Sequence, residues 1–276
     1  MLFGREVAIE FGTEGTTGRR LSGLRIAFDV LHTRSSPPSP ARVQVWNLSD
    51  ASISALQAPR SVVRLYTGYK DDGLPKLIFA GNPTTTGTKI ERQGVDRVAT
   101  IELRDGGDRY QSARVDKSFR ASTSFAEVFA EALDAFGLPS AGGLPAGSSK
   151  ITFPNGLHLA GTARDVFDML AAAAGAHWFI RDGVVFMLGR EAGTTETAPV
   201  FSSKARNLIG SPSRTEDEGI EIRALLDPSM RPGRPFRVES REFNGNYIAR
   251  DVHFIGDSGF DLPFYVDVTG RPLGRT

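Results

Sequence analysis

Two groups of carboxylates have the residue types and spacing that could do chemistry. Asp105 and Asp108 flank a pair of glycines, and three acidic residues follow one another at 216–218. Paired carboxylates hydrolyse glycosides when an apolar pocket keeps one of them protonated near neutral pH. Both groups here lie in polar, glycine-rich sequence. We therefore interpret them as solvated loop residues rather than as a catalytic pair.

Four histidines, His32, His158, His177 and His253, are the candidate metal ligands. No two of them have the spacing of a metal motif, and H-E-x-x-H is absent. All four fall on or beside predicted strands, which favours structural or surface roles; a histidine site assembled in three dimensions is the alternative. The chain has no cysteine, so thiolate ligands, cysteine nucleophiles and disulfides are excluded.

Nucleophile and phosphate motifs are also incomplete. G-x-S-x-G does not occur, and Gly210-Ser211-Pro212 puts a proline where the nucleophile elbow would turn. The stretch 142–150 (GGLPAGSSK) is similar to a phosphate loop, but two serines separate Gly147 from Lys150 where the motif needs lysine at once. We interpret it as a flexible loop. The sequence predicts no catalytic, cofactor-binding or metal-binding residues, no cofactor, and a protein that is not an enzyme.

The balance of charge weakens two further classes of function. The chain has 33 basic and 32 acidic residues, a net charge near +1, so it has no global attraction for nucleic acid or an anionic membrane. Arg5, Glu6 and Glu10 interrupt any apolar core of a signal peptide. The most apolar window, 166–188, contains charged residues and cannot span a bilayer. These features predict a soluble protein, and the lack of cysteine fits a reducing cytoplasm.

The first segment, residues 1–105, reads as β structure. Apolar residues alternate with others over 24–30, the period of a strand with one buried face. Three prolines follow in the loop 34–40, and a short helix capped by Ser49 or Asp50 follows the next strand. Further strands are predicted at 62–69, 76–80, 84–90 and 95–103. Strands at such short spacing are typical of a barrel or sandwich.

The middle segment, residues 106–203, changes to a helical period. Apolar residues from Phe125 to Phe136 follow one helix face, with a capping box at Ser124 and Glu127 and a C-terminal glycine at Gly137. A second helix is predicted over 163–174, followed by strands at 177–180 and 184–188. The segment therefore reads as a small α+β domain.

The last segment, residues 204–276, returns to strands, at 221–226, 235–240, 247–254 and 264–268. Arg271 and Arg275 are interpreted as exposed tail residues, with a partner contact as the alternative. Trp46 and Trp178 sit at strand positions that favour core packing. The fold class is therefore α+β, mainly β, with two β domains flanking an α+β domain.

The order of these motifs resembles the baseplate hub proteins of tailed bacteriophages. The resemblance rests on 24–30, 43–49, 65–69 with 78–81, the Asp105-Gly106-Gly107 turn, 157–188, and 218–233. It covers nearly the whole chain, although no one motif is diagnostic. Two departures are the acidic and glycine-rich connections and the lack of an attached spike or hydrolase domain within these 276 residues.

The resemblance implies two tail-tube-like β-barrel or sandwich domains and a homotrimer. Its ring of six similar domains would adapt a sixfold tail tube to a threefold spike around a central channel through which DNA can pass, without specific nucleic-acid or membrane binding. Implied partners are the tail tube or distal tail protein, the spike protein, other baseplate proteins and the tape measure protein. The implied location is the virion tail baseplate, and the host cytoplasm during assembly. Two alternatives are a tail-associated cell-wall hydrolase and a host-surface binding module.

Overall fold

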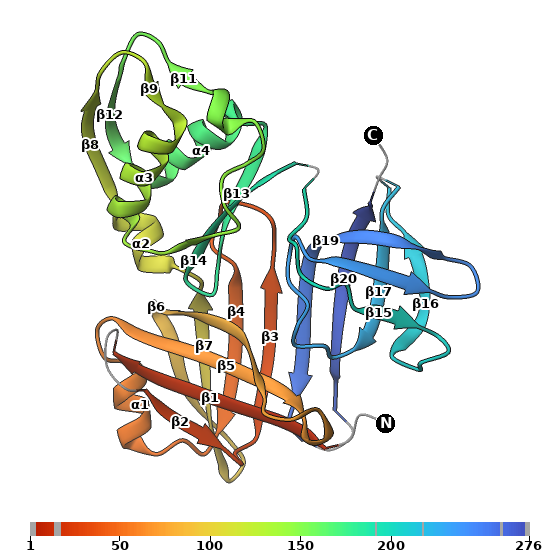
Figure 1. Ribbon diagram of the computed structural model, residues 1–276. Helices are drawn as coiled ribbons and strands as arrows, with labels where there is room; N and C mark the ends of the chain where they lie inside the picture. The colour runs from red at the N-terminus through yellow and green to blue at the C-terminus, as the bar shows by residue number, and fades with distance from the viewer. Residues whose placement is uncertain (1–3, 14–17, 191, 217, 260–261, 274–276) are drawn as a thin grey trace. The chain divides into compact units, whose positions relative to one another are not determined.

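The computed structural model describes residues 4–13, 18–190, 192–216, 218–259 and 262–273 (Figure 1). The chain divides into two compact units. The first contains Met1–Thr33, Ser39–Asp105 and Thr195–Thr276, and the second contains Arg34–Pro38 and Gly106–Thr194. Strands dominate, as the mainly β prediction required. Among the described helices, none has the length and apolar character needed to cross a membrane.

One 13-stranded sheet builds the first unit. Its strands are β1 Arg5–Thr13, β2 Arg19–Ser22, β3 Ile26–His32, β4 Pro40–Trp46, β5 Ser61–Tyr69, β6 Lys76–Gln93, β7 Asp96–Arg104, β15 Val200–Ser202, β16 Leu208–Arg214, β17 Ile220–Leu225, β18 Pro235–Glu239, β19 Asn244–Asp257 and β20 Phe264–Pro272. The main path is β16-β17-β20-β19-β3-β4-β7-β6-β5-β1-β2, with β18 pairing β19 and β15 pairing β18. Helix α1, Asp50–Leu56, begins at the N-cap Ser49 and packs against β1 and β5.

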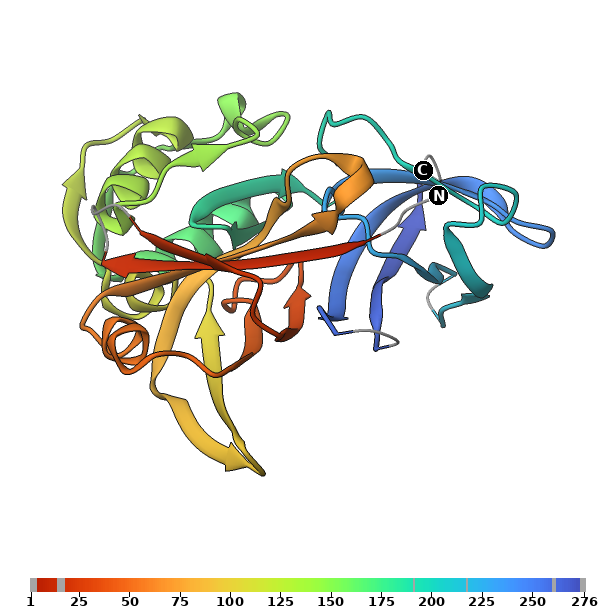
Figure 2. The same ribbon diagram turned by 90° about the horizontal axis from the view of Figure 1, so that it is seen from below.

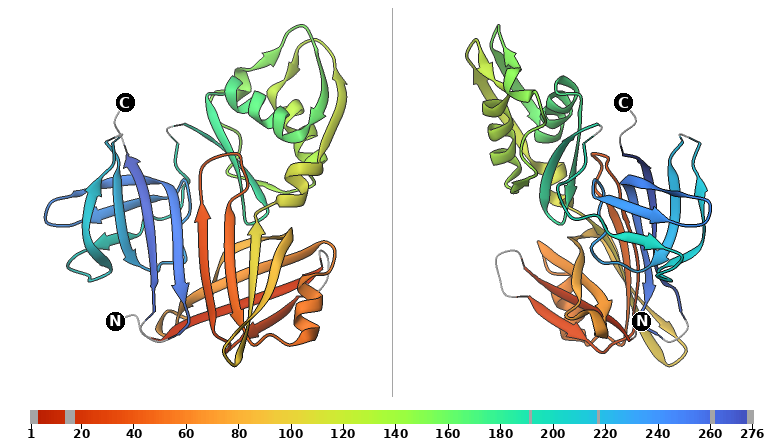
Figure 3. Two further views of the ribbon diagram at one scale, coloured as in Figure 1. Left: turned by 180° about the vertical axis from the view of Figure 1, so that it is seen from behind. Right: turned by 45° about the vertical axis from the view of Figure 1, so that its right-hand side comes forward.

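The pairing of β3 with β19 joins the two β segments into this one sheet (Figures 1 and 3). The strands are antiparallel, with Val252 opposite His32 and Gly256 opposite Phe28. A Cβ at Gly256 would lie 2.2 Å from the Phe28 ring, so only glycine lets this ring lie flat across the strand. The β segments at the two ends of the sequence are therefore continuous in space.

The core of the first unit follows the period of two along its strands. On β3, Ile26, Phe28 and Val30 are buried, and they join one apolar cluster with Val252 and Phe254 of β19. Fully burying such a side chain stabilises the fold by about 1.5–3 kcal/mol relative to exposure. The pairing of β3 with β19 is thus sealed by a shared core as well as by backbone hydrogen bonds.

Strand β6 is longer than the sequence predicted. The run 76–80 and the additional strand at 84–90 are one strand of 18 residues, interrupted by a register shift between Pro83 and Thr88. Gly87 lies in that irregularity, where a Cβ would come within 2.7 Å of the Glu102 carbonyl oxygen. Beyond it, β6 and β7 run on as a hairpin that projects past the neighbouring strands (Figure 2), and its tip residue Val95 is fully exposed.

The second unit combines helices with three small sheets. Its elements are α2 Gly107–Ser112, β8 Arg114–Phe119, β9 Thr123–Ser124, α3 Phe125–Phe136, β10 Ser140–Ala141, β11 Thr152–Phe153, β12 Leu157–Thr162, α4 Ala163–Ala173, β13 Ala176–Arg181 and β14 Val184–Gly189. The capping box of α3 is present at Ser124 and Glu127, and Gly137 adopts φ 64° at its end, as the sequence predicted. The Phe167 ring lies 5.5 Å from that of Phe136 and 5.0 Å from that of Trp178, which fixes both helices on β13.

Candidate assembly surface

The carboxylates singled out in the sequence do not form a shared acidic pocket. Asp105, expected to be solvated, is completely buried at the end of β7, where its backbone N–H donates to Ser39 O at 3.1 Å. That expectation was wrong because glycine-rich sequence marks a tight turn rather than exposure. Asp108 is exposed in the first turn of α2, and Glu216 and Glu218 are exposed between β16 and β17. Asp217 lies outside the described residues.

The four histidines are dispersed. His32 is buried, and its Nε2 donates to Ile78 O at 2.7 Å; His253 on β19 contacts Asp29 Oδ1 at 2.7 Å. In the second unit, His158 Nδ1 lies 2.9 Å from Ser118 Oγ, and His177 is exposed on β13. No group of three or more potential metal-binding side chains occurs among the residues that the structure describes.

The remaining candidates lie on regular elements or loops. Gly210-Ser211-Pro212 is part of β16, and the stretch 142–150 is a loop that ends in a single 3-10 turn. Arg271 is half-buried opposite Ile248 within β20, so the prediction of an exposed tail was wrong for it. Arg275 lies outside the described residues.

The two tryptophans differ in burial. Trp178 is buried, as predicted, and its Nε1 donates to Asp168 at 2.6 Å. Trp46 is only partly buried, and the Arg25 guanidinium lies 4.2 Å from its ring. Trp46 is therefore shielded by a cation rather than enclosed in the apolar core.

Eight strands of the first unit form one uninterrupted run, β16-β17-β20-β19-β3-β4-β7-β6. At one end, β16 pairs only with β17 among the described strands. At the other end, β5 covers only the first part of β6, over Lys76–Gly81, so the part of β6 beyond the register shift pairs with β7 alone in the described chain. The run thus has two unpaired edges, and unpaired strand edges are templates for pairing with another chain.

The exposed face of this run carries a row of polar contacts, each of which joins side chains on two neighbouring strands. Arg223 binds Asp267 through two hydrogen bonds of 2.7 and 2.9 Å. His253, opposite Asp267 on the neighbouring strand, contacts Asp29 at 2.7 Å. Arg42 on β4 lies opposite Asp29 and donates to Glu102 Oε1 on β7 at 2.6 Å, so it continues the same row.

The ion pairs of this row compensate charge but contribute little to the stability of the fold. Exposed ion pairs contribute only about 0–1 kcal/mol each because water screens them. The hydrogen bond to Asp267 raises the pKa of Arg223 above its already high ordinary value, so this residue stays charged. Arg223 and Arg42 each face a carboxylate on a neighbouring strand, so the positive charges of this row are compensated.

Comparison with known proteins identifies the fold. No protein-family model and no curated protein sequence matches the chain. Among solved structures, the 43 kDa tail protein of prophage MuSo2 from Shewanella oneidensis matches 98% of this chain and 99% of its own at a TM-score of 0.63 and 9% identity. A tail protein from Neisseria meningitidis MC58 matches 97% of this chain and 96% of its own, at a TM-score of 0.66 and 9% identity.

A third match extends the fold beyond phages. A component of the E. coli type VI secretion system, itself similar in structure to the T4 bacteriophage tail proteins gp27 and gp5, matches 96% of this chain and 77% of its own, with a TM-score of 0.61 and 9% identity. The chain has the fold of these tail proteins. The resemblance to baseplate hub proteins is therefore confirmed at the level of the fold, over nearly the whole chain.

Proposed function

We propose that this chain is a structural subunit of a phage tail baseplate hub, without enzymatic activity. Over nearly its whole length it shares its fold with the prophage MuSo2 tail protein from Shewanella oneidensis and with a tail protein from Neisseria meningitidis. A structural role also accounts for the dispersal of the histidines and carboxylates described above. Residues 1–105 and 204–276 would be the two tail-tube-like domains, and residues 106–203 the α+β domain between them.

The continuous run of eight strands is the observation that carries the proposal. It ends in two different unpaired edges, β16 and the far part of β6, so one copy can pair its β16 with β6 of the next. Contacts between unlike surfaces close into rings when the rotation between copies closes. Three copies would form a ring in which each contributes two similar β domains, matching a sixfold tail tube on one side and a threefold spike on the other.

The exposed face of the run suits the wall of a channel. DNA binds proteins largely through neutralisation of its phosphates by Lys and Arg. On this face Arg223 and Arg42 already face the carboxylates of Asp267 and Glu102. A wall with compensated charge lets a polyanion pass without retaining it. The hub would occupy the virion tail baseplate, next to tail tube or distal tail, spike and tape measure proteins.

Light scattering coupled to size-exclusion chromatography tests the ring. We expect three times the monomer mass, and a ring with a central hole in electron micrographs. Ile209→Lys places a charge on the exposed side chain of edge strand β16 and should lower the trimer fraction by about tenfold or more. Leu74→Lys introduces the same charge at another exposed apolar residue, between β5 and β6, and as the control it should leave the mass unchanged.

A stable monomer at micromolar concentration, alone and after mixing with tail tube and spike proteins, would contradict the ring. Zymography on peptidoglycan tests the absence of activity. Clearing that disappears in the Asp108→Asn variant would show that the chain is a hydrolase.

A further inference from the structure

A basic pocket of about 630 Å³ opens in the first unit between β1, the turn after β2, and the residues Ser258 and Gly259 that follow β19. Arg5, Arg20, Arg25 and Lys70 line it, whereas Glu6 is the one acidic residue among the described lining residues. The whole chain, by contrast, has 33 basic and 32 acidic residues. The pocket is therefore a local concentration of positive charge on an almost neutral protein.

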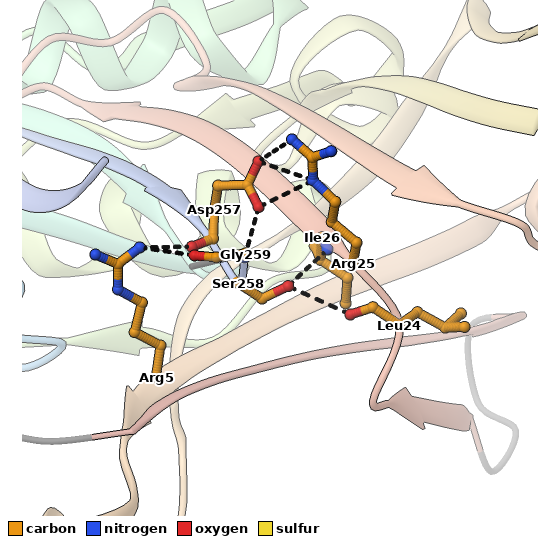
Figure 4. A network of polar contacts seen from close by, with 7 residues as sticks. All are labelled: Arg5, Leu24, Arg25, Ile26, Asp257, Ser258 and Gly259. Atoms are coloured by element: carbon orange, nitrogen blue, oxygen red, sulfur yellow. Dashed lines mark hydrogen bonds and ion pairs between the residues drawn. The ribbon is translucent and has the colours of Figure 1, made fainter. Parts of the chain in front are cut away.

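Asp257, the last residue of β19, and Gly259 hold two of these arginines in place (Figure 4). Arg25 forms an ion pair with Asp257, with Nη2 at 3.0 Å from Oδ2. Arg5 instead donates to the backbone carbonyl oxygens of Asp257 and Gly259, at 3.2 and 3.0 Å. Ser258 ties these residues to β3 by accepting from a backbone N–H at 3.0 Å. Arg25 is thus neutralised, but Arg5 is oriented by neutral groups and keeps its charge uncompensated.

The other two cations differ in their surroundings. Arg20 lies opposite Glu10 in the pairing of β1 with β2, and its guanidinium lies 4.4 Å from the centre of the Tyr66 ring, whose hydroxyl donates to Glu10. Lys70 follows β5, and its backbone N–H donates to Gly4 O at 2.9 Å. Neither side chain forms an ion pair with any residue that the structure describes. Arg5 and Lys70 therefore bring to the pocket two positive charges that form no ion pair with a described residue, and Arg20 adds a third beside Glu10, whereas Glu6 is the one acidic residue of the described lining.

The shape and the remaining lining favour a peptide over a nucleic acid. Val7, Leu24 and Pro75 add apolar wall between the cations. A nucleic acid needs cations spread along a track that follows its phosphates, whereas these cations converge on one pocket. Carboxylates form directed hydrogen bonds with guanidinium groups, and aliphatic stems beside them bury against apolar wall.

We propose that this pocket binds an acidic segment of a partner protein, with two or more neighbouring Asp or Glu residues beside an apolar residue. The proposal needs neither three copies nor a channel, so it stands apart from the ring. A monomer that binds the acidic segment would contradict only the ring, and a ring that does not bind it would contradict only the pocket.

Fluorescence anisotropy with the full chain tests the pocket. The probe is a fluorescein-labelled peptide of four glutamates and two leucines. The double variant Arg20→Glu/Lys70→Glu should weaken its binding by roughly tenfold or more, because it reverses two of the positive charges that line the pocket. The matched control Arg120→Glu/Lys150→Glu makes the same change in net charge on exposed residues of the second unit, and should change the binding by less than about twofold.

Each other result would overturn the proposal. Equal loss in the two double variants would show nonspecific attraction, and no binding of the peptide at millimolar protein would show that the pocket has no such ligand. Inorganic phosphate or a single-stranded oligonucleotide that binds more tightly than the peptide, and is lost in the pocket variant, would make it a phosphate site instead. Circular dichroism of the variants verifies that both remain folded.

Discussion

The contacts within the two units differ in how far apart their residues lie in the sequence. In the second unit, α3, α4 and β13 meet through Phe136, Phe167 and Trp178, which lie within one continuous stretch of sequence. In the first unit, β3 pairs with β19, so that His32 lies opposite Val252. The difference teaches that the second unit can form from local sequence, whereas the first needs both ends of the chain.

The two tryptophans of the chain allow this comparison to be measured. Trp46 lies on β4 of the first unit, and Trp178 lies on β13 of the second. In a Trp178→Phe background, fluorescence reports on the first unit. In a Trp46→Phe background, it reports on the second.

Removing a buried ring from β19 should have the largest effect. Phe254 is completely buried, and its ring lies 6.2 Å from that of His32 on β3. Phe254→Ala should lower the free energy of unfolding of the first unit by about 3–5 kcal/mol, through lost burial and the cavity that remains. Denaturant titration followed by Trp46 fluorescence measures this, while the Trp178 transition should not move.

Phe167→Ala makes the same substitution in the second unit. The Phe167 ring is as buried as that of Phe254, but it belongs to the core of the second unit. It should shift the Trp178 transition and leave the Trp46 transition in place. If either variant shifts both transitions equally, the two units unfold as one and the comparison fails.

Overpacking the contact between β3 and β19 should have an intermediate effect. The added Cβ in Gly256→Ala would meet the Phe28 ring at 2.2 Å, so the buried ring must move. We expect a loss of about 1–3 kcal/mol from the first unit, measured by the Trp46 transition. Gly161→Ala on β12, where the nearest atom is 3.9 Å from the new Cβ, is the control and should change neither transition appreciably. An equal effect of the two substitutions would show that the close approach is unimportant.

The smallest effect should come from the cap of α3, and it should depend on pH. The backbone N–H of Ser124 donates to Glu127 at 2.8 Å, and this bond, with that of the Ser124 hydroxyl, lowers the pKa of the Glu127 carboxyl. A lowered pKa in the folded state means that the ionised group stabilises above its ordinary pKa, and that this contribution is lost as the pH falls through the folded value.

Glu127→Gln should therefore destabilise the second unit slightly at pH 7 and less at pH 3. Unfolding followed by Trp178 at both pH values measures the difference. Asp134→Asn, at an exposed residue further along α3, is the control for a change of charge without loss of the cap. A difference between Glu127→Gln and the unmodified chain that persists undiminished at pH 3 would contradict this assignment.

Local features of the fold could be predicted from the sequence. The capping box at Ser124 and Glu127 and the alternation on β3 depend on a few adjacent residues, and both are present in the structure. Other elements were missed because their sequence carries no such period. Strand β16 contains Gly210 and Pro212, which usually interrupt strands, and α2 begins at glycine without a side-chain cap.

The candidate surfaces could not be predicted in the same way, because tertiary structure brings their residues together. Arg223 and Asp267 are unremarkable charges until antiparallel pairing places them opposite each other. The basic pocket likewise combines Arg5 and Arg20 with the turn at Asp257. Asp105 is buried where its backbone N–H donates to Ser39 O, from a residue far from it in the sequence. A pattern of neighbouring residues contains no information on such contacts.

The pairing of β3 with β19 also sets an order of events during synthesis. A ribosome adds roughly 5–20 residues per second, so on the order of 10–45 s separate the emergence of His32 from that of Val252. Throughout that interval β3 has a bare edge, while the second unit already has every residue of its core. The nascent chain should therefore acquire protease resistance first in its middle, and its amino-terminal strands only after β19 has been synthesised.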